Sequence, residues 1–105
     1  MNRYTLAPSA RDDLHSIWDY IATEHDRPET ADRLIETLYD KFVRLAENPF
    51  MGEVRQDLAD IVKDIRSFSV GNYVIYYHVT QGRVRVGRIL HGARDARVIL
   101  SEDES

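Results

Sequence analysis

Three β-rich runs separated by two-residue turns constrain the fold of this chain more than any other feature. Residues 65–70 and 83–90 alternate apolar and polar side chains, whereas residues 73–80 are β-rich on both faces. Gly71-Asn72 and Gln81-Gly82 lie between the runs and are residue pairs that favour tight hairpin turns. The pattern predicts a three-stranded antiparallel meander. Because its second run is apolar on both sides, we expect that strand in the middle of the sheet, with helices on one face.

A short strand and an amphipathic helix are predicted at the start of the chain. Residues 3–7 are β-rich and are followed by a proline, which cannot donate to a sheet ladder. Ser9 then suits an N-cap, with Asp12 in place of the usual Glu of a capping box. Apolar residues at helical spacing extend this helix from about residue 10 to residue 23. Trp18 shares their stripe, which favours a core role over a role as an exposed anchor.

A second amphipathic helix is predicted next. Thr30 suits its N-cap, an apolar stripe runs from Ala31 to Leu45, and Asn48-Pro49 marks its end. Two such helices form a hairpin whose stripes need a further apolar surface. We therefore expect an α+β domain of order β-α-α-β-β-β, in which the helical hairpin packs on a small, mainly antiparallel sheet.

A single domain is predicted for residues 1–100, because 105 residues suffice for one core and not for two. Residues 57–63 fit either a helical turn or an irregular connection, and residues 96–100 fit either a strand or a short helix. The acidic tail, residues 101–105, is expected to be disordered.

Several classes of site are excluded by residue content. The chain has no cysteine, which removes disulfides, thiolate metal sites and cysteine nucleophiles and fits a reducing cytoplasm. No secretory leader, membrane-spanning run or common catalytic motif is present. The four histidines do not fall at metal-ligand spacings, so no metal or cofactor is expected; they are His15, His25, His78 and His91.

The charge is distributed unevenly along the chain. The formal net charge is −4, but the stretch from Arg66 to Arg97 contains six arginines and only one acid, Asp95. Arg83 and Arg85 alternate with valines, which places them on the sheet face opposite the helices. They are either solvated edge charges that oppose aggregation or part of a binding surface.

Arg88 does not fit the alternation of its strand. Period-two counting places it on the same face as Val84 and Val86, which is the apolar face. Either Gly87 is a bulge that shifts the phase, or Arg88 points inward and is paired. Of its possible roles, we favour contact with a ligand.

Arg66 presents the same difficulty, because it shares a face with Phe68 and Val70. A buried arginine needs a carboxylate, and Asp95 or Asp64 is the expected partner in a structural ion pair. Farther on, residues 91–95 combine a histidine, a glycine, an arginine and an acid. This segment fits either a general acid–base site or a turn closed by an Arg–Asp pair.

In order and spacing, five segments together resemble the ParE toxins of the ParE/RelE superfamily. The resemblance extends from about Tyr4 to Ile99, and no single motif decides it. The matching segments are Leu14 to Ala22, Ala31 to Leu45, Asn48 to Gly52, Ile65 to Phe68 with Tyr73 to Tyr77, and Ile89 to Asp95.

The resemblance implies a cytoplasmic type II toxin, linked to plasmid stabilisation, that poisons DNA gyrase and is not itself an enzyme. It also implies a ParD-like ribbon-helix-helix antitoxin, whose C-terminal segment we expect in an apolar groove on the outer side of the helical hairpin. Neither a membrane nor sequence-specific binding of nucleic acid by the toxin alone is expected. The candidate target-binding residues are Arg83, Arg85, Arg88, His91, Arg94 and Arg97.

Two alternatives stay open at this stage. A RelE-like, ribosome-dependent mRNA endonuclease would use His91 as acid–base and Arg66 and Arg88 as phosphate ligands. Against it, the chain has only two lysines, no tyrosine after Tyr77 and a negative net charge, which opposes approach to a phosphate-rich surface. The third possibility is a non-toxic module that only binds its antitoxin.

Overall fold

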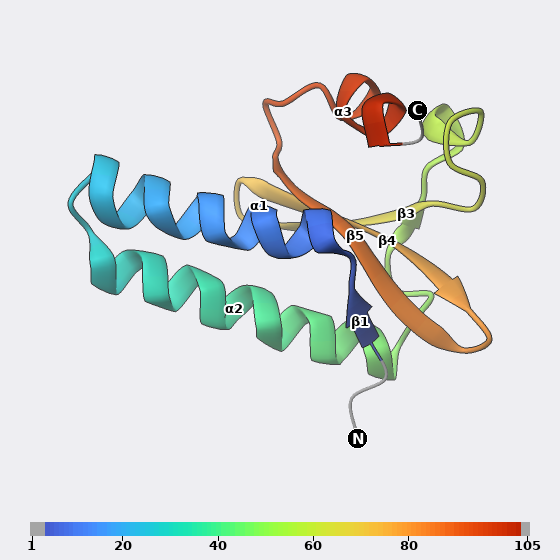
Figure 1. The fold of residues 1–105 in the computed structure, drawn as a ribbon. Helices are drawn as coiled ribbons and strands as arrows, with labels where there is room; N and C mark the ends of the chain where they lie inside the picture. The colour runs from blue at the N-terminus through green and yellow to red at the C-terminus, as the bar shows by residue number, and fades with distance from the viewer. Residues whose placement is uncertain (1–3, 104–105) are drawn as a thin grey trace.

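The computed structural model describes residues 4–103, which form a five-stranded sheet with a helical hairpin on one face (Figure 1). The chain is mixed α+β, as predicted. In chain order the elements are β1 (Tyr4–Leu6), α1 (Pro8–Asp19), the π-helix η1 (Tyr20–Glu24), α2 (Pro28–Glu47), β2 (Glu53–Val54), the 3₁₀-helix η2 (Gln56–Leu58), β3 (Arg66–Val70), β4 (Tyr73–Thr80), β5 (Arg83–His91) and α3 (Ala96–Asp103).

The sheet has the order β1-β5-β4-β3-β2. Strands β3, β4 and β5 form the predicted antiparallel meander with β4 in the centre, and β1 pairs in parallel with β5 at one edge. Gln81 and Gly82 both have positive φ, at 53° and 74°, which matches the twist of a tight hairpin. The turn chemistry read from the sequence thus sets the register of the two long strands.

Both long helices begin at a proline rather than at a polar cap. Pro8 occupies the first turn of α1 after Ala7, and Pro28 occupies that of α2 after Arg27. Neither N-cap residue forms a side-chain cap bond. Proline lacks the N–H that a first turn leaves unpaired, and its φ is already helical. The caps predicted at Ser9 and Thr30 are therefore wrong, and both helices start earlier than expected.

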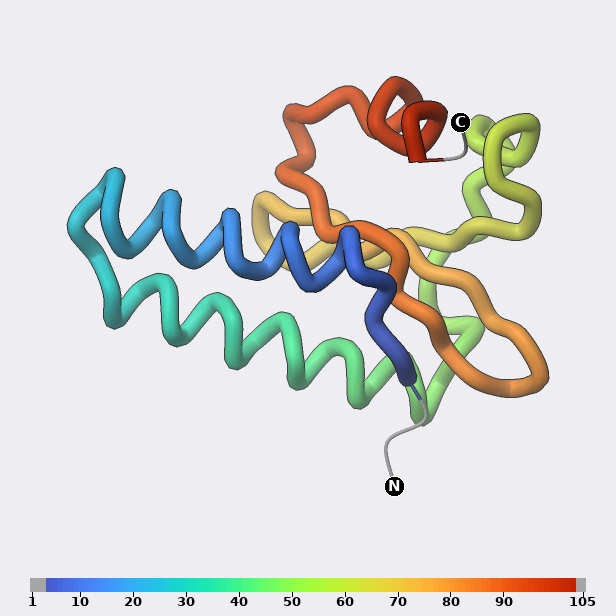
Figure 2. The backbone as a smooth tube through the Cα atoms, viewed as in Figure 1, coloured from blue at the N-terminus to red at the C-terminus, as the bar shows by residue number. Residues whose placement is uncertain are grey.

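The first helix ends in a π-helical turn. From Tyr20 to Glu24 the backbone widens, and the Thr23 hydroxyl donates to the carbonyl of Asp19. A π-turn disturbs the regular bonding ladder, so this side-chain bond satisfies an acceptor at the junction. The continuous tube of Figure 2 shows this segment leading into the tight turn to α2.

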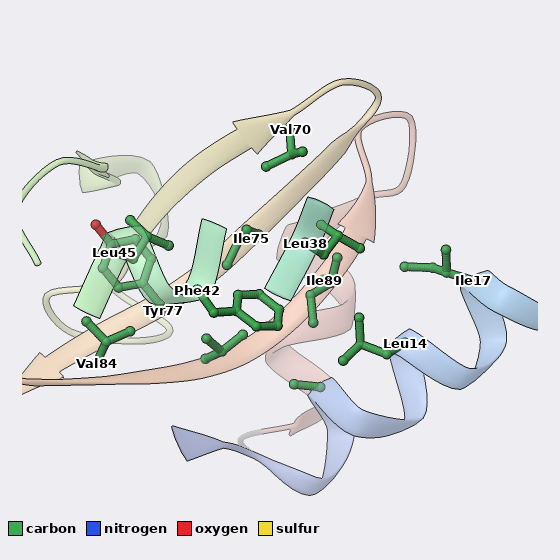
Figure 3. Packing of buried hydrophobic residues seen from close by; sticks show 12 residues of the cluster. Leu14, Ile17, Leu38, Phe42, Leu45, Val70, Ile75, Tyr77, Val84 and Ile89 are labelled. Atoms are coloured by element: carbon green, nitrogen blue, oxygen red, sulfur yellow. The ribbon is translucent and has the colours of Figure 1, made fainter. Parts of the chain in front are cut away.

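The main core lies between the hairpin and the sheet (Figure 3). Leu38, Phe42 and Leu45 of α2 are fully buried against side chains of β4 and β5. Each such side chain contributes roughly 1.5–3 kcal/mol by leaving water. Tyr77 is also fully buried, and its hydroxyl accepts a hydrogen bond from the Gly52 N–H and donates one to the Pro49 carbonyl, both at 2.9 Å.

A smaller core covers the opposite face of the sheet, which explains why β4 is apolar on both sides. Its buried members are Leu58, Ile65, Tyr76, Leu90 and Leu100. Residues 96–100 are thus helical, and α3 continues through residues 101–103. The prediction of a disordered tail is wrong for those three residues, and residues 104–105 lie outside the described part. The expectation of helices on only one face of the sheet is also wrong, because α3 packs on the other face.

Trp18 is not a core residue, contrary to prediction. Its side chain is 36% exposed at the edge of the α1 stripe, and its indole N–H donates to the Asp32 carboxylate of α2 at 2.8 Å. Within residues 4–103, no helix has the length and apolar character needed to cross a membrane.

Candidate interaction surface along β5

Arg88 sits at the centre of a three-element ion-pair cluster. Its Nε and Nη2 donate to the two carboxylate oxygens of Asp13 in α1, each at 2.8 Å. Its Nη1 contacts the Asp103 carboxylate of α3 at 3.0 Å, and the Ile89 N–H also donates to Asp13 at 2.9 Å. The hydrogen bond to the Asp13 carboxylate raises the pKa of Arg88, and this effect outweighs the lowering of the pKa by burial. Arg88 is therefore engaged on all three nitrogens inside the protein.

A bulge at Gly87 places Arg88 in that cluster. Tyr76 is opposite Arg88 and Tyr77 is opposite Val86, so Gly87 is the extra residue. The bulge moves Arg88 from the hairpin face to the α3 face of the sheet. The first alternative is thus correct, because Gly87 is a bulge that shifts the phase. Of the second, the pairing of Arg88 is correct, but its side chain does not point to the face of Val84 and Val86.

Arg66 has a different environment from the one predicted. Its Nη1 donates to the Gly52 carbonyl at 2.9 Å, and its guanidinium lies 4.9 Å from the centre of the exposed Phe50 ring. Among residues 4–103 it forms no ion pair, so the expected pairing with Asp95 or Asp64 is wrong. Backbone carbonyls and a ring face compensate the charge instead.

Arg83 and Arg85 are exposed at the start of β5, on the face opposite the hairpin, as predicted. Arg85 Nη1 lies 3.4 Å from the Thr5 hydroxyl of β1. Neither arginine pairs with a carboxylate in the described residues. This end of the sheet therefore presents two uncompensated cations.

The segment after β5 is organised by His91 and Asp95. His91 Nδ1 accepts the Ala93 N–H at 3.1 Å, and its ring packs edge-on against Tyr73 at 5.3 Å. Asp95 accepts the Val98 N–H at 3.3 Å at the start of α3. Arg94 forms no ion pair in residues 4–103, so the Arg–Asp turn does not exist.

The charge of Arg97 is compensated by a carboxylate, unlike that of Arg94. It forms an ion pair with Asp60 and donates to the Asp57 carbonyl at 2.8 Å. The hydrogen bond from Arg97 lowers the pKa of the Asp60 carboxyl. Together these contacts attach α3 to η2 and to the segment that follows it.

The candidate cations are therefore separated into two groups rather than one strip. Arg83 and Arg85 lie at one end of β5, and His91 and Arg94 lie at or beyond the other, roughly 20 Å away at about 3.3 Å per residue. The three residues expected in an endonuclease are also apart. Arg66 and Arg88 are on opposite faces of the sheet. His91 pairs with the first residue of β4, whereas Arg66 pairs with a residue nearer to the other end of that strand.

Comparison with known proteins identifies the family. Residues 4–96 match the family described as the ParE toxin of the type II toxin-antitoxin system, parDE. The chain belongs to this family. Toxin ParE1 of Mycobacterium tuberculosis, in strains CDC 1551 and H37Rv, is 31% identical over 97 residues, covering 90% of this chain and 93% of the relative. This chain is thus a ParE-family type II toxin.

A solved structure supports the fold assignment. The chain matches one described as the chromosomal ParDE TA system from P. aeruginosa with a TM-score of 0.67 and 19% identity, over 87% of this chain and 96% of that one. At this identity the match shows the shared ParE fold alone.

Asp13 is a residue of this site that the sequence pattern did not single out. The Asp13 side chain is only 12% exposed. One signal was present, because Asp13 lies three residues after Ala10 and four before Ile17, both of which face the sheet. An acid between two core positions of a helix is a candidate partner for a misplaced arginine.

Proposed function

We propose that this toxin inhibits DNA gyrase and is neutralised by a ParD-like antitoxin. The observation that carries the gyrase proposal is the pair of uncompensated arginines, Arg83 and Arg85, on an exposed sheet face of an acidic chain. Arginine forms planar, bidentate and stacked contacts that suit protein interfaces. Arg94 offers a further cation at the distant end of β5.

A local patch of this kind favours a protein target over the ribosome. Affinity for a phosphate-rich surface rises with the number of cations that reach it, and the formal net charge of −4 opposes the approach of this chain to such a surface. Because Arg66, Arg88 and His91 are spread over two faces of the sheet, they do not form the single site that the endonuclease alternative requires.

Gyrase inhibition is tested with purified toxin in supercoiling and DNA-cleavage assays. Arg83→Gln combined with Arg85→Gln should lower inhibitory potency about tenfold, corresponding to about 1.4 kcal/mol of binding free energy. Arg33→Gln, at an exposed position on α2, is the matched control and should retain full potency. Unchanged gyrase activity together with cleavage of mRNA on translating ribosomes would support the endonuclease instead, and normal bacterial growth on expression would support a non-toxic module.

The antitoxin is proposed to occupy a groove on the outer side of the helical hairpin. This groove has a volume of about 450 Å³ and is lined by Leu14, His15, Trp18, Asp19, Ile35 and Tyr39. Its apolar lining suits a segment that folds on binding. Trp18 is the only tryptophan of the chain, so its fluorescence reports directly on occupation of the groove.

Docking is tested with the C-terminal segment of the ribbon-helix-helix protein encoded beside the toxin. We expect a change in Trp18 emission and slower hydrogen exchange in α1, α2 and the sheet. Tyr39→Ala should weaken binding, whereas Phe50→Ala, which alters an exposed ring outside the groove, should not. Unchanged exchange in both the hairpin and the sheet would contradict this docking site.

A further inference from the structure

A second cleft, distinct from the hairpin groove, lies between the flank of α1 and the end of the sheet. Its volume is about 520 Å³, and Figure 1 shows the segment between β5 and α3 passing beside α1. The residues that line it are Asp13, Ser16, Ile17, Tyr20, Tyr73, Ile89, Leu90, His91 and Arg94. The cleft therefore draws on the first helix, both long strands and the segment after them.

The cleft has an apolar floor and an aromatic wall. Ile17, Ile89 and Leu90 are buried beneath it. Tyr20, the first residue of the π-turn, and Tyr73 form the aromatic wall, and burial, with a smaller electrostatic contribution from Tyr20, raises the pKa of Tyr73. These surfaces suit a bulky apolar or aromatic group, because aromatic rings offer large contact areas with little loss of conformational freedom.

The polar groups around the cleft favour an anionic partner. The Asp13 carboxylate already accepts three hydrogen bonds, from Arg88 and from the Ile89 N–H. Arg94, in contrast, pairs with no carboxylate of residues 4–103. Because His91 Nδ1 accepts the Ala93 N–H, the proton of the neutral ring lies on Nε2, which is then a donor.

We propose that this cleft binds a peptide segment of a partner protein in which a bulky apolar side chain adjoins one carboxylate. The apolar group would lie on the floor and against the tyrosines, and the carboxylate would accept from Arg94 and His91. A single free arginine matches a single anionic group. A polyanion such as a nucleic acid would instead meet the Asp13 carboxylate, which lines the cleft, and the exposed Asp12 next to it on α1. The inference shares Arg94 with the gyrase proposal but uses neither Arg83 and Arg85 nor the hairpin groove.

The test uses a capped tetrapeptide, acetyl-Ala-Phe-Asp-Ala-amide, titrated into ¹⁵N-labelled full-length toxin and followed by NMR. We expect chemical-shift changes confined to residues 16–20, 73 and 89–94. Replacing the aspartate of the peptide by asparagine keeps its shape and removes its charge, and should weaken binding about fivefold or more. Replacing the phenylalanine by alanine should abolish detectable binding.

Variants of the toxin assign the contacts. Arg94→Gln should reduce affinity for the aspartate peptide to that of the asparagine peptide, and Tyr20→Ala, at a 56% exposed position, should weaken both. Arg33→Gln is the matched charge control and should change neither. Equal affinity for the two peptides, shifts outside the cleft, or tighter binding of adenosine monophosphate than of the aspartate peptide would overturn the proposal.

Discussion

Gly52 is required by the close approach of the chain to Tyr77. A Cβ at this position would overlap the Tyr77 hydroxyl and lie 2.7 Å from its ring and 2.8 Å from the Ser67 carbonyl. Neither the fully buried ring nor the strand backbone has room to move. We expect Gly52→Ala to lower the free energy of unfolding by about 1–3 kcal/mol, measured by urea denaturation.

Gly87 provides the control for that substitution. A Cβ there would meet nothing closer than the Tyr76 carbonyl at 3.6 Å, and its φ is not left-handed. Gly87→Ala should therefore cost less than about 1 kcal/mol. Equal stability of the two variants would show that the contact between Gly52 and Tyr77 is not tight in solution.

Asp13 compensates the largely buried charge of Arg88, so its loss should lower the free energy of unfolding substantially. Asp13→Asn leaves the Arg88 guanidinium, 16% exposed, with Asp103 as its remaining carboxylate. We expect a loss of about 2–3 kcal/mol, less than for a pair broken completely because Asp103 stays in place. Asp12→Asn changes an exposed neighbour on the same turn and should stay within about 0.5 kcal/mol. Comparable urea midpoints for the two variants would contradict a stabilising role of the cluster.

The helix α3 is attached by one buried leucine and a few ion pairs, so it should open separately from the rest of the fold. Leu100 is 5% exposed and packs with Leu58 and Leu90. Leu100→Ala should weaken this attachment by about 2 kcal/mol, and the α3 amides should exchange about thirtyfold faster while those of β4 keep their rates. Val98→Ala, at a 52% exposed position, is the control. Equal acceleration in α3 and β4 would mean that α3 is not a separate unit.

Elements with a strong local period were predictable, and those set by distant partners were not. The meander follows from turn residues and alternation within 26 positions, and the hairpin from two apolar stripes. The helix starts were misplaced because polar caps were expected at Ser9 and Thr30, whereas Pro8 and Pro28 lie in the first turns, a position that suits proline. The short helix α3 depends on its packing against Leu58, which local sequence does not encode.

At the scale of the whole molecule, ion pairing decides which charges the surface presents. The sequence shows a cationic stretch but not its partners, since Arg88 meets Asp13 across 75 positions. Contacts to Asp13, Asp103 and Asp60 neutralise Arg88 and Arg97 and leave Arg83, Arg85 and Arg94 without carboxylates in the described residues. The sequence therefore indicated a set of candidate cations, but neither which of them are paired nor their division between the two ends of β5.

The whole fold should lose stability in alkaline solution. Burial raises the pKa of Tyr4, Tyr73 and Tyr77 above the ordinary value of 10.0. Above about pH 10 the unfolded chain therefore releases tyrosine protons that the native protein retains, so it binds fewer protons and the free energy of unfolding falls as pH rises. The stabilisation is complete below the unfolded pKa and is lost as pH increases through the native values. Urea unfolding between pH 8 and about 11 measures this decline, and it should be shallower in Tyr73→Phe, whose ring cannot ionise. An equal slope in that variant would show that Tyr73 does not contribute to the pH dependence.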